Sequence, residues 1–160
     1  MAAPQEKVLE LLSRVNDPEI PVLNVVEMGI VREVSEDEKG LNVAITPTYS
    51  GCPAMEVIER EIRETLEREG MGPVSVRKVF APAWTTDWLT GEAKRKLREY
   101  GIAPPGPSCG SALLEDEAPT PCPFCRSGET ELRSRFGSTA CKALYYCRGC
   151  QQPFEKFKCI

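Results

Sequence analysis

The chain of 160 residues contains no histidine at all. Histidine is the usual general base of nucleophile pairs and a common ligand of zinc-hydrolase and di-iron sites, so those site types are excluded. Long apolar stretches are also missing from the sequence, because no segment approaches the ~20 apolar residues of a membrane-spanning helix. Any chemistry must therefore depend on thiolates, carboxylates or a bound cofactor.

Basic residues are scarce over most of the chain. Residues 1–118 hold 13 Lys and Arg against 21 Asp and Glu, a net charge of −8, whereas residues 119–160 carry a net charge of +4. A basic segment of this size is modest for a nucleic-acid binder, and the acidic part would repel phosphate. We expect neither a nucleic-acid partner nor a membrane. The chain starts directly on an amphipathic pattern with no signal-peptide core, which favours a cytoplasmic protein with reduced thiols.

Cysteine is abundant, with eight residues, and four of them form two Cys-x-x-Cys pairs. Two intervening residues let a tight turn direct both sulfurs at one ion, and two such turns give a tetrahedral set of four thiolates. The pairs are separated by one short segment, residues 126–146, which holds two of the expected strands, as in a zinc ribbon. Thiol–disulfide exchange would instead need a βαβ context, which this segment lacks. We expect a structural zinc site, although the spacing also accepts iron. The four ligands are Cys122, Cys125, Cys147 and Cys150.

The patterning predicts an α+β fold: a small α/β N-terminal domain with a three-stranded sheet and helices, followed by an all-β zinc ribbon. We place the first domain at residues 1–101, a Pro-rich acidic linker at residues 102–121 and the ribbon at residues 122–160. In the first domain, Thr90 is expected to cap the last helix and Gly101 to end it. The expected helices are 4–15, 54–70 and 90–100, and the expected strands are 30–34, 41–46, 74–80, 130–136, 143–146 and 153–158.

Cys52 stands in a loop bounded by proline and glycine, directly before a helix. The N–H groups and partial positive charge of a helix start favour a thiolate and predict a lowered pKa. Cys52 is therefore a candidate nucleophile or metal ligand, or else a small apolar residue packed under the loop. Asp17 and Glu19 are expected to serve as turn and cap residues, or to lie near Cys52 and orient a ligand or partner.

Three further cysteines lie outside the paired motifs: Cys109, Cys141 and Cys159. One interpretation places them with Cys52 around a second metal ion or a transient iron–sulfur cluster, because soft thiolates suit such centres. The alternative is that they are buried structural cysteines. A disulfide is disfavoured by a reducing compartment.

Two tryptophans flank a short polar segment after the third expected strand. Exposed aromatic residues anchor interfaces, so this segment is a candidate partner-binding surface. Burial of the rings against the first domain is the alternative. The candidate residues are Trp84, Thr85, Thr86, Asp87 and Trp88.

Two motifs in the first domain resemble iron–sulfur assembly proteins of the SufT type, over about residues 5–80. They are DPEIP at residues 17–21 and TPTYSGCP at residues 46–53. More specific segments are similar to the PaaD (PaaJ) family of the bacterial phenylacetyl-CoA epoxidase system, and this resemblance spans nearly the whole chain. Those segments are residues 81–89, 100–105, 136–144 and 153–159.

The resemblance implies an accessory or maturation subunit of a phenylacetyl-CoA ring monooxygenase in aerobic phenylacetate degradation, aiding iron–sulfur or metal-centre assembly. It implies other epoxidase subunits as partners, especially the iron–sulfur reductase subunit. The residues agree with an accessory role, because the chain lacks the Glu-x-x-His ligands of a di-iron oxygenase and a Gly-x-Gly-x-x-Gly dinucleotide loop. A zinc-stabilised adaptor without catalysis, and a thiol enzyme using Cys52, remain as alternatives.

Overall fold

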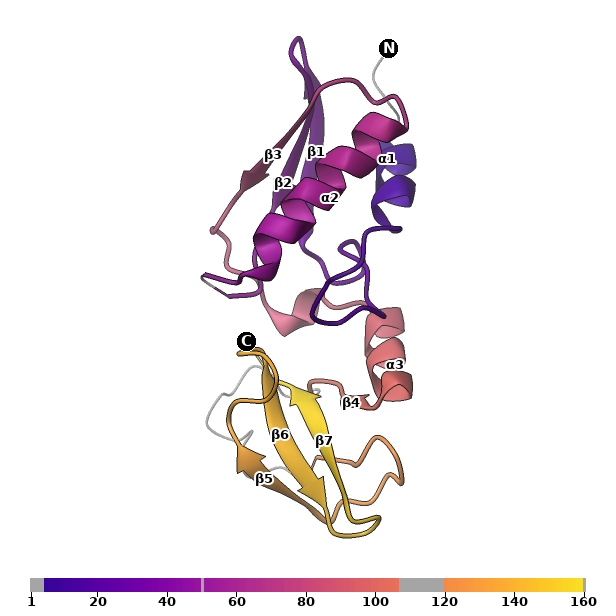
Figure 1. Ribbon diagram of the computed structural model, residues 1–160, viewed down its shortest axis with the longest axis vertical. Coiled ribbons are helices and arrows are strands. Elements are labelled where there is room, and N and C mark those ends of the chain that lie inside the picture. Colours follow the sequence, from indigo (N-terminus) through magenta and orange to yellow (C-terminus); the bar gives the residue numbers. More distant parts are fainter. Residues whose placement is uncertain (1–4, 50, 107–119, 160) are drawn as a thin grey trace. The chain divides into compact units, whose positions relative to one another are not determined.

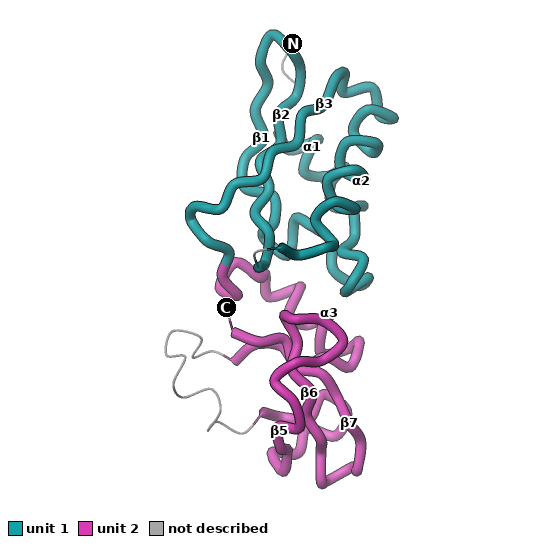
Figure 2. The backbone as a smooth tube through the Cα atoms, turned by 60° about the vertical axis from the view of Figure 1, so that its left-hand side comes forward, with its two compact units in different colours: residues 1–84 teal, residues 85–160 magenta. Residues whose placement is uncertain are grey.

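The computed structural model describes residues 5–49, 51–106 and 120–159, and its helices and strands have the predicted α+β composition (Figure 1). The chain divides into two compact units, residues 1–84 (unit 1) and residues 85–160 (unit 2), coloured separately in Figure 2. Among the described residues, no helix has the length and apolar character needed to cross a bilayer.

Unit 1 is a three-stranded sheet with two helices (Figure 1). Its elements are α1 Gln5–Leu12, β1 Val31–Asp37, β2 Gly40–Ile45, α2 Ala54–Arg68 and β3 Val74–Lys78. The strand order is β1-β2-β3, with an antiparallel first pair and a parallel second pair. A parallel pair needs a crossover connection, and α2 provides it. The predicted three-stranded sheet is confirmed.

Helix α2 is held to unit 1 by an apolar stripe at helical spacing. Ile58, Ile62 and Leu66 are completely buried, as their spacing predicts. Burial of each such side chain stabilises the fold by about 1.5–3 kcal/mol. The helix begins directly after Pro53, so its first N–H groups face the loop that carries Cys52.

A capping box fixes the chain between α1 and β1. Asn24 Oδ1 accepts hydrogen bonds from the backbone N–H groups of Val26 and Glu27, at 3.0 and 2.9 Å. Glu27 Oε1 accepts in return from the N–H of Asn24, at 2.9 Å. This reciprocal pattern satisfies the donors of a short helical turn and makes Asn24 its cap.

Unit 2 contains a helix and a four-stranded sheet (Figure 1). Its elements are η1 Thr86–Trp88, α3 Gly91–Tyr100, β4 Ile102–Ala103, β5 Thr130–Ser134, β6 Lys142–Cys147 and β7 Gln152–Phe157. The strand order is β4-β7-β6-β5, antiparallel except for the parallel pair of β4 and β7.

The ends of α3 are those that the sequence predicts. Thr90 Oγ1 accepts a hydrogen bond from the N–H of Ala93 at 3.1 Å, and Gly101 ends the helix in the left-handed conformation, with φ of 95°. A Cβ atom on Gly101 would lie 2.9 Å from the ring of Phe124, in the first Cys-x-x-Cys pair. Gly101 therefore permits both the turn and the close approach of that ring.

The compact units divide 17 residues earlier than the proposed end of the first domain, at Trp84 rather than at Gly101. The physical reason is β4, because Ile102 and Ala103 pair with Glu155 and Lys156 of β7. These two buried residues stand in the segment that the sequence suggested as a linker. Their pairing joins α3 to the metal-binding sheet.

Candidate metal centre and the Cys52 loop

Four thiols converge at one end of the unit 2 sheet. Their sulfur atoms all lie within 4.8 Å of one another, with Cys122 and Cys150 separated by 3.7 Å and Cys125 and Cys147 by 3.5 Å. Tetrahedral zinc with Zn–S bonds of about 2.3 Å requires sulfur separations of about 3.8 Å. The four predicted ligands therefore have the spacing and the soft donor chemistry of a tetrathiolate metal centre.

Backbone groups preorganise the first knuckle, residues 122–125. The N–H of Phe124 donates to Cys122 Sγ at 3.4 Å. The N–H of Arg126 donates to the carbonyl oxygen of Cys122 at 2.9 Å, which closes the turn. Such N–H donors stabilise sulfur that carries negative charge, as a bound thiolate does.

The thiols of the cluster differ in pKa. The backbone N–H of Cys150, followed by neighbouring thiols, lowers the pKa of Cys147 to about 7. Burial and the adjacent thiols raise the pKa of Cys150 to about 12. A divalent metal must displace the remaining protons, so metal binding is coupled to proton release.

The residue after each knuckle adopts a left-handed backbone conformation. Arg126 has a φ of 64° and Gln151 has a φ of 60°. Non-glycine residues rarely adopt this conformation, which costs about 1–2 kcal/mol. The two knuckles thus repeat one local backbone path, each with a small strain that a bound metal can offset.

We expect Gln151→Gly to preserve metal binding and to leave the stability of unit 2 within about 1 kcal/mol of the parent, because relief of strain offsets the flexibility of glycine. Gln151→Val should destabilise unit 2 by about 2 kcal/mol, because a β-branched side chain is strongly disfavoured at positive φ. Chemical denaturation of the metal-loaded chain measures both changes. Equal stability of the glycine and valine variants would contradict this account.

Cys52 lies buried in unit 1, in the loop that precedes α2. Its burial raises the pKa of its thiol, although the backbone N–H of Ala54 and the side chain of Tyr49 lower it. The expected net lowering by the helix start is therefore wrong, because loss of hydration outweighs the helix N–H groups. Tyr49 is a neighbour that the sequence reasoning missed, although it stands in the same loop motif.

The carboxylates of Glu19 and Asp17 also raise the pKa of Cys52, so both lie close enough to act on the thiol. Asp17 is buried, and its Oδ1 accepts from the backbone N–H groups of Glu19 and Ile20, at 2.7 and 3.0 Å. Asp17 thus has the expected turn role and also stands in the electrostatic surroundings of Cys52. A thiol beside two carboxylates favours cations over anions.

The other cysteines are distributed over both units. Cys141 is a buried, reduced thiol of unit 2, 3.1 Å from the Thr139 hydroxyl, whereas Cys159 of unit 2 is disulfide-bonded, in contrast to the expectation of reduced thiols. Cys109 lies outside the described residues. Within the described ranges, the knuckle thiols form the one cluster of three or more potential metal ligands. A second metal or cluster site drawn from Cys52, Cys109, Cys141 and Cys159 stays a hypothesis, and it would require the disulfide of Cys159 to be reduced, because only a thiolate binds such a centre.

Part of the candidate partner surface is buried. Trp84 is 2% exposed, and its indole N–H donates to the carbonyl oxygen of Met28 at 2.8 Å within unit 1. Thr86 is 1% exposed, Thr85 and Trp88 are half-buried, and Asp87 is exposed. Trp84 and Thr86 therefore do not offer exposed anchors, because their side chains are taken up by the fold.

Comparison with known proteins assigns two segments of the chain to two different protein families. Residues 5–77 match the family model described as "Iron-sulfur cluster assembly protein", and residues 106–158 match "PaaD zinc beta ribbon domain". A putative 1,2-phenylacetyl-CoA epoxidase subunit from Escherichia coli strain K12 is 50% identical over 100% of this chain and 96% of its own length. The chain belongs to the PaaD family of epoxidase subunits. The resemblance drawn from the motifs is confirmed.

More distant relatives match part of this family member. A "Fe-S protein maturation auxiliary factor" from Porphyromonas gingivalis is 34% identical over 58% of this chain and 90% of its own length. A Domain of Unknown Function DUF59 structure from Bacillus anthracis has a TM-score of 0.55 and 27% identity, covering 58% of this chain and 90% of that one. A conserved hypothetical protein from Thermotoga maritima has a TM-score of 0.51 and 31% identity, covering 61% and 98%. The four-cysteine cluster lies in the part that matches the zinc ribbon model.

Proposed function

We propose that this chain is an accessory, maturation subunit of a phenylacetyl-CoA epoxidase system in phenylacetate degradation, working in the cytoplasm on an iron–sulfur or other metal centre. The observation that carries the proposal is the full-length likeness to the Escherichia coli epoxidase subunit, combined with the match of residues 5–77 to iron–sulfur cluster assembly proteins. That matched segment contains the Cys52 loop.

In this proposal Cys52 binds the metal or cluster that is delivered as cargo. Its raised pKa keeps the thiol protonated at neutral pH, which limits its oxidation. A soft cation can replace the proton, and the negative charges of Asp17 and Glu19 favour its approach. One thiolate cannot complete a ligand set, so the recipient protein or a second copy of the chain supplies the other ligands.

The tetrathiolate site then has a structural role. It holds zinc, and the folded ribbon docks other epoxidase subunits, with the iron–sulfur reductase subunit as the recipient. Four cysteine ligands leave no open position on a tetrahedral ion, which is typical of structural rather than catalytic zinc.

A pure adaptor is the second candidate function. It is favoured by the observation that, among the described residues, a complete ligand set exists only in the ribbon. The adaptor would connect oxygenase and reductase subunits through the zinc-stabilised unit, and Cys52 would have no chemical part in it.

Co-production of the epoxidase subunits with and without this chain tests the two functions. Maturation predicts that the reductase subunit made without it contains less iron and acid-labile sulfide per protein. The adaptor predicts full cluster content but loss of subunit co-purification. If both cluster content and co-purification are unchanged, neither function holds. Metal analysis of the anaerobically purified chain should give one zinc per chain in the ribbon.

A further inference from the structure

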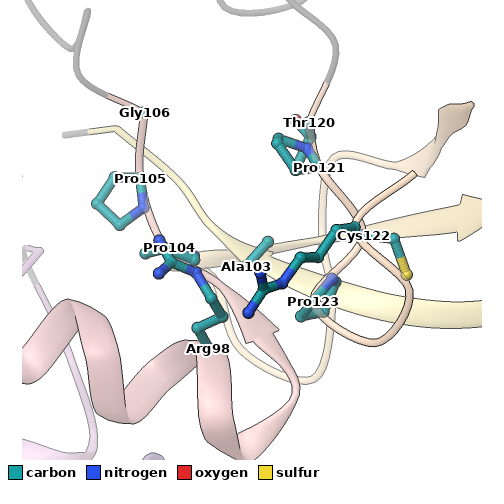
Figure 3. A pocket seen from close by; sticks show the side chains of 10 residues that line it. Arg98, Ala103, Pro104, Pro105, Gly106, Thr120, Pro121, Cys122 and Pro123 are labelled. Atoms are coloured by element: carbon teal, nitrogen blue, oxygen red, sulfur yellow. The ribbon is translucent and has the colours of Figure 1, made fainter. Parts of the chain in front are cut away.

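Unit 2 has a partly open pocket of about 400 Å³ beside the first knuckle (Figure 3). Two stretches that are distant in sequence form its walls: the end of α3 with the residues after β4, and the residues that lead into the knuckle. Its volume falls within the range of small-molecule sites, about 300–1,000 Å³.

The walls of this pocket are mostly apolar. Four prolines line it, Pro104, Pro105, Pro121 and Pro123, together with the buried side chain of Ala103 (Figure 3). Proline has no backbone N–H, so these residues offer no hydrogen-bond donor to a ligand. Their rings also limit the rearrangement that binding would require, which reduces its entropic cost.

The polar groups of the pocket are donors. Arg98 and Arg126 line it, and within the described part of the chain neither guanidinium forms a salt bridge. The contrast with Arg95 of α3 is informative, because Arg95 forms ion pairs with both Glu92 and Glu99. Two unpaired guanidinium groups at one small pocket suit a carboxylate or phosphate.

Thr120 lines the same pocket and is 5% exposed, so its backbone amide can report a ligand that binds there.

We propose that this pocket binds a small organic anion, with its carboxylate or phosphate head at Arg98 and Arg126 and its apolar body against Ala103 and the prolines. The site is distinct from the four-thiolate cluster, although Cys122 and Arg126 connect the two. It does not depend on the proposed function, because only the local chemistry of unit 2 supports it.

Titration of the zinc-loaded full chain, followed by amide NMR shifts, tests this proposal with four probes. Phenyl phosphate and benzoate carry an anionic head on an apolar body, benzyl alcohol lacks the charge, and inorganic phosphate lacks the body. We expect saturable shifts at Ala103 and Thr120 with at least one of the first two probes. The head that binds more tightly identifies the ligand class. Benzyl alcohol and inorganic phosphate should each bind at least about fivefold more weakly.

Arginine variants locate the binding. Arg98→Gln and Arg126→Gln should each weaken binding about fivefold, the loss expected for one exposed charge-assisted hydrogen bond. Glutamine is suited to position 126, because Gln151 adopts the same left-handed conformation in the second knuckle. Arg95→Gln is the matched control and should leave the affinity unchanged. Equal weakening in all three variants, or no saturable shift with either anionic probe, would overturn the proposal.

Discussion

Replacing Cys147 by serine is expected to remove the bound metal and to unfold the strand-rich part of unit 2, while unit 1 keeps its fold. Cys147 is completely buried and ends β6, so its loss affects both the metal centre and the sheet. Zinc binding in small tetrathiolate and related sites contributes about 10–16 kcal/mol of folding free energy. That contribution equals or exceeds the entire stability of a typical domain, about 5–15 kcal/mol.

The measurements are zinc per chain and amide hydrogen exchange on the full chain. Protection should be lost along β6 and β7 and should remain in α2 of unit 1. Cys141→Ser is the matched control, because Cys141 is also a buried, reduced thiol of unit 2 but is not part of the four-sulfur cluster. The control should keep one zinc and lose about 1–3 kcal/mol of stability. A Cys147→Ser chain that retains one zinc and a protected sheet would refute the assignment.

Local features of this chain could be predicted from sequence because they depend on residues close together. The Cys-x-x-Cys spacing predicted the four thiols that converge, and the cap at Thr90 and the stop at Gly101 predicted both ends of α3. Each of these signals depends on turn and cap chemistry within a few residues. The apolar stripe of α2 was predictable for the same reason.

Nonlocal pairing could not be predicted in this way. Strand β4 is only two residues long and pairs with β7 more than fifty residues later, so no periodicity marks it. Its segment is rich in proline, and composition therefore suggested a linker. Because that pairing was missed, Arg98 and Arg126 were placed in separate domains, and the pocket that both line had no sequence signal.

The direction of the pKa shift of Cys52 also could not be predicted from local sequence. The sequence correctly indicated a helix start after the cysteine, and N–H groups there do lower the pKa of the thiol. The extent of burial and the approach of Asp17 depend on the folded unit, and they reverse the net direction. A motif can therefore identify a thiol without giving its protonation state.

The raised pKa of Cys52 has a measurable consequence for stability. A thiol whose pKa is higher in the folded state contributes its full stabilisation at neutral pH and loses it as the pH rises through that raised value. Unfolded cysteine ionises near pH 8.5, so the loss should begin at about pH 8.5. The free energy of unfolding of unit 1 should fall there in the parent and stay flatter in Cys52→Ala. Identical pH profiles for the two proteins would show that the thiol is not held protonated by the fold.

Cys52→Ser is expected to lower the cluster content of the co-produced reductase subunit to the level found without this chain. Serine keeps the size of the side chain but removes the soft sulfur ligand, so cargo binding is lost. Unit 1 should remain folded, with a loss of about 1–3 kcal/mol, because a hydroxyl replaces a buried thiol. Iron and acid-labile sulfide per reductase subunit are the quantities to measure.

Two controls separate chemistry from folding in this experiment. Cys52→Ala keeps an apolar site, so equal loss of cluster content in the alanine and serine variants assigns the effect to the missing thiol. Cys141→Ser changes a buried thiol of unit 2 and should support full cluster content. If Cys52→Ser also supports full content while co-purification of the subunits persists, Cys52 has no part in cluster delivery. The zinc-stabilised adaptor would then account for the role of this chain, since docking requires the folded ribbon and no ligand in unit 1.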